Sequence, residues 1–352
     1  MSTHSAASDR SFRERLHRSL GDAYVIIREL GGGGSARVFL ATEIALERTV
    51  VLKVLPAELT AGIDGTRFHR EILIAARLQH PHLVPLLNAG EPAADEPHGA
   101  GSALRWYAMP FVEGQTLREH LQLRGTLPLH EALRLLRELA SALAYAYAKG
   151  VVHRDIKPEN ILLSDGVAMI ADFGVAKALE DASAEAVSSG RRLTTVGMIL
   201  GTPAYMAPEQ VNNAHVVDHK ADLYALACVA YEILTGAPPF VRPSLRATMA
   251  AQVSTAPTPL TQLRTDVPAP IADMLMRCLE KDPRQRPHSA TAVVKVLDGL
   301  SAPPVPPPVP PPVPPPPAAT VENTPQTRTP LPVWLVAMVV VLLVAAGWWA
   351  RG

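Results

Sequence analysis

The chain has 352 residues, and its 33 lysines and arginines balance its 33 aspartates and glutamates, which gives a formal net charge of +0 at pH 7. This balance leaves no field of one sign, so we expect no nucleic acid partner and no attraction to an anionic membrane surface. The length suffices for two or three ordinary domains. Neither Cys228 nor Cys278 has the spacing of a zinc site or a disulfide framework, so we expect reduced core cysteines in a cytosolic compartment.

The first part of the chain predicts a strand, a glycine run and a second strand. Residues 1–23 form a polar N-terminal segment, without the apolar core of a signal peptide. Alternation from Tyr24 to Leu30 favours a strand, Gly31 to Gly34 follow directly, and strand-like sequence resumes at Val38. Such glycines let backbone N–H groups approach phosphates without obstruction by side chains, although four glycines alone would also suit a flexible linker.

A lone lysine interrupts the next apolar run. Val50 to Leu55 is rich in β-branched residues and predicts a buried strand, in which the ammonium of Lys53 is costly unless it is paired. Residues 67–78 favour a helix that carries Glu71. Two well-patterned helices are predicted after it, from Leu117 to Leu123 and from Leu129 to Lys149.

Two short motifs carry the chemistry. The stretch His153-Arg154-Asp155-Ile156-Lys157-Pro158-Glu159-Asn160 is followed by Asp172-Phe173-Gly174. Together they place an acidic base, a cation and two metal-binding side chains in order along two short loops. These are the groups that move a phosphoryl group from a nucleotide to a hydroxyl.

The two motifs strongly resemble the catalytic core of Ser/Thr protein kinases of the bacterial, eukaryotic-like type. Such kinases read H-R-D-L-x-x-x-N and then D-F-G, and this chain differs by Ile156 in place of leucine. The resemblance covers residues 24–300. It implies an α+β, two-lobed protein-kinase-like fold, with a small β-rich N-lobe over about residues 24–110 and a larger helical C-lobe over about residues 114–300.

The resemblance also implies a binding site for ATP. The kinase pattern G-x-G-x-x-G-x-V fits Gly31, Gly33 and Val38, with Ala36 at the third glycine. Lys53 is similar to the strand lysine that holds the α- and β-phosphates, and its carboxylate partner would be Glu71. The residues implied in nucleotide binding are Leu30, Gly31, Gly32, Gly33, Gly34, Ser35, Ala36, Arg37, Val38, Lys53, Glu71, Met109 and Val112.

Residues 107–114 resemble the hinge of a kinase. Met109 is similar to the gatekeeper, and the backbones of Phe111 and Val112 would face the edge of the adenine. Pro110 has no N–H, so its neighbours must supply the hydrogen bonds of the hinge. Val51 stands where the family usually has alanine, and its additional methyl groups would press on the adenine.

In the catalytic loop, the resemblance makes Asp155 the base that accepts the proton of the substrate hydroxyl. Lys157 would neutralise the transferring phosphoryl group, while Asn160 and Asp172 would bind Mg²⁺, with Mn²⁺ as an alternative. A degenerate pseudokinase lacks the strand lysine, the base or the metal-binding aspartate. This sequence retains all three, together with the catalytic set Asp155, Lys157, Asn160 and Lys53.

The segment from Asp172 to Glu209 resembles a kinase activation segment. Thr202 matches the threonine that contacts the base, and together with Lys157 it points to Ser and Thr acceptors. Asp222 matches an aspartate that supports the catalytic loop. Arg286 is similar to the arginine that pairs with Glu209, although a plain surface cation is the alternative.

Arg154 precedes the base, and in the resembling kinases such an arginine receives a phosphate from the activation segment. Thr194 and Thr195 are the best-placed acceptors for that phosphate, with Ser183, Ser188 and Ser189 as weaker ones. We therefore expect autophosphorylation, and with it a homodimer in which one copy phosphorylates the other.

The composition changes after Leu300. Residues 301–330 form a proline-rich linker, and the run from Pro303 to Pro317 predicts an extended spacer of roughly 45 Å, with a ligand for proline-binding domains as the alternative. Residues 331–350 contain no charge and would span roughly 30 Å as a helix. We expect a transmembrane helix rather than a buried globular one, because the stretch follows a tether with no domain to bury it.

These features predict a Ser/Thr protein kinase that transfers the γ-phosphoryl group of ATP to protein substrates. It would be a single-pass protein of the inner cell membrane, held by its C-terminal helix, with a cytoplasmic kinase domain. Two alternatives stay open: a small-molecule phosphotransferase, which would have no reason to keep Gly201-Thr202 and Ala207-Pro208-Glu209, and a membrane-tethered scaffold that binds nucleotide without turnover.

Overall fold

The computed structural model describes residues 3–33, 36–55, 65–90, 104–173, 203–212 and 217–301. They belong to one compact unit, Met1–Pro303, and a second unit comprises Pro304–Gly352. The expected transmembrane helix, and the expected linker beyond Ser301, lie outside the described residues. Among the residues described, no helix combines the length and the apolar character that a membrane crossing requires.

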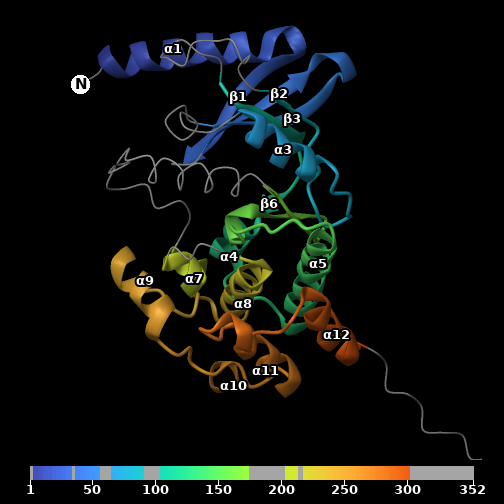
Figure 1. Cartoon of the computed structure of the whole chain (residues 1–352), viewed down its shortest axis with the longest axis vertical. Coiled ribbons are helices and arrows are strands. Elements are labelled where there is room, and N and C mark those ends of the chain that lie inside the picture. Colours follow the sequence, from blue (N-terminus) through green and yellow to red (C-terminus); the bar gives the residue numbers. More distant parts are fainter. Residues whose placement is uncertain are drawn as a thin grey trace, which may run out of the picture. The chain divides into compact units, whose positions relative to one another are not determined.

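The N-lobe is an antiparallel sheet of five strands in the order β1-β2-β3-β5-β4, accompanied by helix α3 (Figure 1). The bounds are β1 Tyr24–Gly33, β2 Ala36–Glu43, β3 Arg48–Val54, β4 Asn88–Gly90, β5 Trp106–Pro110 and α3 Gly65–Ala76, with short 3₁₀ turns at Gly21–Ala23 and Ile44–Leu46. The strands expected around the glycine run and Lys53 are confirmed. However, β1 continues through the first three glycines, because Gly31 pairs with Val38 and Gly33 with Ala36.

The side chains of strand β3 alternate between the two faces of this sheet. Side chains alternate along a strand, so Val50, Leu52 and Val54 point to one face, while Val51 and Lys53 point to the other. The first three lie in an apolar cluster with residues of β1, β2 and β5. Lys53, the charged residue between Val50 and Leu55, therefore lies on the second face, opposite this cluster.

Helix α1, Thr3–Leu20, covers the first face and was not expected from the polar N-terminal sequence. Leu16 and Leu20 are buried in the N-lobe cluster, and Phe12 packs against it one helical turn earlier, so the apolar stripe follows an i, i+4, i+8 pattern. The N–H of Leu104 donates to the Ser19 hydroxyl at 2.7 Å. The helix thus belongs to the folded N-lobe.

Helix α1 also contacts the hairpin that carries the glycine run. The guanidinium of Arg37 lies 4.0 Å from the centroid of the Phe12 ring and 5.3 Å from that of Phe39. The same guanidinium donates to both carboxylate oxygens of Glu29, at 2.8 and 2.6 Å. The Phe12 and Phe39 rings also stack on each other, with centroids 6.1 Å apart, so these contacts connect α1 to β1 and β2 through a cation close to two aromatic rings.

The C-lobe is helical and includes a small sheet, β6-β7-β8. The helices are α4 Leu117–Arg124, α5 Leu129–Ala148, α7 Pro208–Val211, α8 His219–Thr235, α9 Leu245–Ser254, α10 Leu260–Leu263, α11 Ala269–Cys278 and α12 Ala290–Ser301, with 3₁₀ turns at Pro158–Asn160, Pro203–Tyr205 and Pro283–Gln285, and the strands are β6 Gln115–Thr116, β7 Ile161–Ser164 and β8 Val167–Ile170. The helices expected from Leu117 and Leu129 are confirmed. Helix α8 is buried from Ala221 to Leu234, and Cys228 and Cys278 are buried free thiols, as expected.

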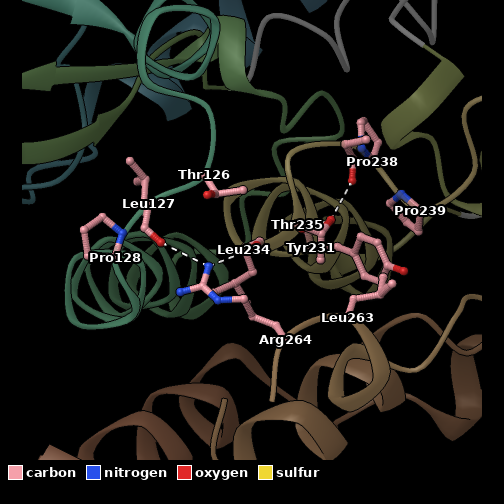
Figure 2. A pocket seen from close by; sticks show the side chains of 11 residues that line it. Thr126, Leu127, Pro128, Tyr231, Leu234, Thr235, Pro238, Pro239, Leu263 and Arg264 are labelled. Carbon is pink, nitrogen blue, oxygen red and sulfur yellow. Dashed lines mark hydrogen bonds between the residues drawn. The ribbon is translucent and has the colours of Figure 1, made fainter. Parts of the chain in front are cut away.

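A groove of about 650 Å³ opens at the C-terminal end of α8, away from the motif residues (Figure 2). Arg264 lies in it and donates to the carbonyls of Leu127 at 3.2 Å and Leu234 at 2.9 Å. The Leu234 carbonyl lies in the last turn of α8, where carbonyls lack intrahelical donors, and the Leu127 carbonyl belongs to the loop before α5. The arginine therefore has a structural role here, and the groove is lined by none of the predicted catalytic side chains.

Truncation of the α1 stripe tests whether this helix stabilises the N-lobe. We expect Leu16→Ala to lower the free energy of unfolding by about 2–5 kcal/mol, because it removes a fully buried side chain and leaves a cavity. His17→Ala, on the exposed side of the same helix, is the control and should stay within about 0.5 kcal/mol of the parent. Urea denaturation measures both, and equal stability of the two variants would contradict the role of α1.

Candidate active site

The catalytic loop gathers two predicted side chains around the carboxylate of a third. The Lys157 ammonium donates to Oδ2 of Asp155 at 2.6 Å, and Nδ2 of Asn160 donates to the same oxygen at 3.0 Å. Asn160 also donates to the backbone carbonyl of Asp155 at 2.8 Å. Two donors thus hold Oδ2, and among the residues described none donates to Oδ1.

His153 connects the catalytic loop to the strand before Asp172. Its side chain is fully buried; Nδ1 accepts from the N–H of Asp155 at 3.1 Å, and Nε2 lies 2.8 Å from the carbonyl of Ala171. A ring nitrogen that accepts is unprotonated, so Nε2 carries the hydrogen and donates. Phe173 packs edge-on against the same ring, with centroids 4.6 Å apart. The two motifs therefore form one packed unit.

Asp222 of α8 supports the loop, as the resemblance implied. Its carboxylate accepts from the N–H groups of His153 and Arg154, both at 2.7 Å, and from the hydroxyl of Tyr147 at 3.2 Å. Burial raises the pKa of Asp222, and the hydrogen bonds from these two N–H groups and from Tyr147 oppose that rise. Gln210 of α7 adds a hydrogen bond to the carbonyl of Arg154 at 2.8 Å.

Two residues of the site adopt a backbone conformation that side chains disfavour. Arg154 has a φ of 69° and Asp172 a φ of 67°, both in the left-handed region. Each such residue costs about 1–3 kcal/mol and persists only where its surroundings hold it. Here the first residue precedes the base and the second carries the expected metal ligand, so the strain coincides with the chemistry.

Lys53 pairs with Asp172 in this structure, whereas Glu71 was the expected partner. The Lys53 ammonium contacts Oδ2 of Asp172, and the Tyr107 hydroxyl donates to Oδ1 at 2.9 Å. Burial alone would raise the pKa of Asp172, but Lys53 and the hydrogen bonds outweigh it and lower that pKa, so the carboxylate is ionised at neutral pH. Position 71 lies on α3, and its side chain is outside the described residues, so the pair with Lys53 stays a prediction.

An apolar cluster lies where the adenine was expected. Val51, Val84, Met109 and Ala171 are buried together, and four half-buried residues pack against them: Val38, Val112, Leu162 and Met169. The structure thus brings Val38, Val51, Met109 and Val112 together, as predicted. Sequence analysis missed Leu162, although its position two residues after Asn160, on the first strand after the catalytic loop, was a usable signal.

The remaining nucleotide residues are only partly described. Leu30 is 38% exposed beside Gly31 on β1, Ala36 and Arg37 pair with Gly33 and Gly32 on β2, and Gly34 and Ser35 lie outside the described residues. At the hinge, the N–H of Phe111 lies 3.5 Å from the carbonyl of Thr49. That donor is thus directed at β3, which favours Val112 over Phe111 as the hinge donor.

The pair between Glu209 and Arg286 is confirmed. The guanidinium donates to both carboxylate oxygens, at 2.7 and 2.8 Å, and also to the backbone carbonyls of Lys220, Glu280 and Lys281. The Arg286 side chain has no exposed surface, which rules out the plain surface cation. Residues 174–202 lie outside the described part, and with them Gly201, Thr202, Thr194, Thr195 and the candidate serines.

The donor set fits a magnesium ion held mainly by a nucleotide. Mg²⁺ in nucleotide sites takes one or two protein oxygens and completes its shell with phosphates and water. Asp172 offers an ionised carboxylate, and Asn160 uses its Nδ2 on Asp155, which leaves its Oδ1 for a cation. In the part of the chain that is described, no group of three or more His, Cys, Asp or Glu forms a metal cage.

Comparisons with known proteins agree with this geometry. The protein kinase domain family matches residues 24–296. Serine/threonine-protein kinase PknB of Mycolicibacterium smegmatis is 35% identical over 82% of this chain and 45% of its own length, and serine/threonine-protein kinase pkn2 of Myxococcus xanthus is 35% identical over 79% and 32%. The chain thus spans less than half the length of these relatives.

A solved structure shows the same fold. The PknI kinase domain of Mycobacterium tuberculosis superimposes with a TM-score of 0.59 at 29% identity, over 79% of this chain and 96% of that one. The family match, these relatives and the packed unit of catalytic loop and Asp172 lead to the same conclusion. The chain belongs to the protein kinase family.

Proposed function

We propose that this protein is a serine/threonine protein kinase that transfers the γ-phosphoryl group of ATP to Ser and Thr hydroxyls of proteins. The observation that carries the proposal is the arrangement around Asp155. One oxygen of its carboxylate is held by Lys157 and Asn160, and no residue in the described part of the chain donates to the other, which is therefore placed to accept a proton. The names of the relatives, which are serine/threonine-protein kinases, support the acceptor class.

The chemistry of this site is mainly positioning. Asp155 accepts the proton as the substrate oxygen attacks the γ-phosphorus, while the bond from that phosphorus to the β-phosphate oxygen breaks and ADP leaves. Lys157 lies 2.6 Å from the same carboxylate, close enough to stabilise charge on the transferring group. The apolar cluster around Val51 and Met109 excludes water from the base of the nucleotide. Asp172 and Asn160 would hold Mg²⁺ when it is bound with ATP, and the ion would neutralise negative charge on the phosphates.

The C-terminal end of the activation segment, with helix α7, favours a polypeptide acceptor. Glu209 is held by the buried Arg286, and Gln210 of the same short helix donates to the carbonyl of Arg154 in the catalytic loop. Tyr205, just before this helix, donates to Glu232 of α8 at 2.5 Å. An ordered platform of this kind beside the base would be superfluous in a small-molecule phosphotransferase.

Membrane attachment and activation by autophosphorylation complete the proposal. The uncharged stretch of residues 331–350 supports a single-pass anchor in the inner membrane, with the kinase domain cytoplasmic, where ATP is supplied. Thr194 and Thr195, within an activation segment that follows Asp172, support phosphate transfer between two copies of the chain.

Removal of the base or of the strand lysine tests the chemistry. We expect Asp155→Asn and Lys53→Met each to reduce phosphate incorporation from labelled ATP by roughly 10²–10⁴-fold, because general-base and electrostatic contributions have this size. Asp165→Asn, in the exposed turn between β7 and β8, and Lys295→Met, exposed on α12, are the matched controls and should retain parental rates. Wild-type turnover in Asp155→Asn or Lys53→Met would show that the role assigned to that residue is wrong.

Phosphorylation of the activation segment is tested by mass spectrometry of active protein. We expect phosphate on Thr194 or Thr195, because a charge of about −1.5 to −2 near the catalytic loop can order a segment through arginine contacts. Asp155→Asn protein should acquire this phosphate only when active protein is added. An active preparation without phosphate between Asp172 and Glu209 would refute this part of the proposal.

Removal of the C-terminal stretch tests the anchor. We expect the full chain to sediment with membranes, and the chain lacking residues 330–352 to remain in the soluble fraction with unchanged kinase activity, because the proline-rich run separates the stretch from the kinase domain. A soluble full-length protein would refute the anchor. Digestion of the kinase domain by protease added outside intact cells would refute the orientation.

A further inference from the structure

The carboxylate of Asp172 is held by two donors from the same face of the N-lobe sheet. Lys53 of β3 and Tyr107 of β5 are direct register partners, so their side chains leave the sheet on one side, next to each other. Lys53 contacts Oδ2, and the Tyr107 hydroxyl donates to Oδ1 at 2.9 Å. Each carboxylate oxygen therefore has its own partner.

Tyr107 is built into the interior between the two lobes. Its side chain is 4% exposed and borders a cavity of about 20 Å³ that is also lined by Met109, Leu78 and Phe173. The phenol O–H is the one group of this side chain that can donate, and the carboxylate of Asp172 is the acceptor that it meets. Tyr107 lies on strand β5, and its side chain has only two torsion angles, so burial restricts the position of the ring.

The two donors differ in what else they must do. Lys53 is a flexible cation that the proposed reaction needs at the phosphates of ATP, so it is available to Asp172 only in part. Tyr107 has no such task in the proposed reaction, and its hydroxyl is placed to keep one oxygen of Asp172 in position. This hydrogen bond stabilises the site because Asp172 has a strained φ of 67° and would relax without support.

We propose that Tyr107 is a positioning residue for the metal-binding aspartate. Its hydroxyl orients the Asp172 carboxylate from the N-lobe side, and so sets how strongly a divalent ion adds to nucleotide binding. The inference rests on the proposed function, since it takes Asp172 as the ligand that meets the nucleotide-bound ion. Tyr107→Phe isolates the hydroxyl, because phenylalanine keeps the ring that lines the cavity with Met109 and Phe173.

The test compares binding of fluorescent N-methylanthraniloyl-ADP in EDTA and in saturating Mg²⁺. In the parent, the ratio of the two dissociation constants measures the contribution of the metal. We expect Tyr107→Phe to reduce this ratio about tenfold, the effect of one hydrogen bond to a charged group, with the dissociation constant in EDTA unchanged within about twofold. A titration of the ADP complex with Mn²⁺, followed by electron paramagnetic resonance, should show the same weakening.

Tyr24→Phe is the matched control. Tyr24 is also buried in the N-lobe, and its hydroxyl accepts a hydrogen bond from Asn88 at 3.0 Å, away from Asp172. We expect this variant to keep the parental ratio. An unchanged or increased ratio in Tyr107→Phe, or an equal loss of affinity with and without metal, would overturn the proposal and leave Tyr107 with a packing role only.

Asp172→Asn separates this inference from the proposed function. If this variant loses the contribution of the metal while Tyr107→Phe keeps it, the role of Tyr107 is refuted and the kinase site stands. If Asp172→Asn retains the full contribution, the assignment of the metal ligand is wrong, and the inference about Tyr107 is refuted with it. Because the measurement is of binding, it requires no phosphoryl transfer.

Discussion

The buried carboxylate of Asp222 is the contact on which the catalytic site depends. It projects from α8, the most deeply buried helix among those described. It accepts hydrogen bonds from the N–H groups of His153 and Arg154, both at 2.7 Å. A buried charge is tolerated only when several donors satisfy it, and the buried N–H groups of this loop in turn need an acceptor. The core of the C-lobe thereby fixes the backbone immediately before Asp155. Removal of the carboxylate would free the strained Arg154 and, with it, the base.

His153, which is held by Asp222, connects the catalytic loop to the Asp172-Phe173-Gly174 motif. One ring nitrogen of His153 meets Asp155 and the other meets the carbonyl of Ala171, while Phe173 packs against the ring. The strand that ends here is also joined to the segment after α3, because the N–H of Val84 donates to the carbonyl of Ile170 at 2.9 Å. The C-lobe half of the site is thus preorganised by buried hydrogen bonds, which salt screens very little.

The sequence predicted those parts of the site that local motifs encode. Asp155, Lys157 and Asn160 lie within one loop, so their spacing along the chain already limits their geometry, and the Glu209–Arg286 pair was identified through the resemblance. Helix α1 was missed, because its apolar stripe of Phe12, Leu16 and Leu20 is diluted by charged neighbours and has meaning only once the sheet face that it covers is known. Tyr107 was missed for a related reason. Its role depends on the register between β3 and β5, which neither strand specifies alone.

The N-lobe half of the site is joined to this preorganised half through charge. Lys53 is the cation opposite Asp172, and an ion pair of this kind is rearranged more readily than the buried bonds around His153. The arrangement suits a nucleotide whose phosphates compete for the lysine, since one half of the site can respond to the ligand while the other keeps its shape. A neutral phenol beside the lysine adds a donor whose strength depends little on ionic strength. The difference follows from burial: His153 and Asp222 are 0% and 1% exposed, whereas Lys53 and Asp172 each keep about a sixth of their side-chain surface exposed, 17% and 15%.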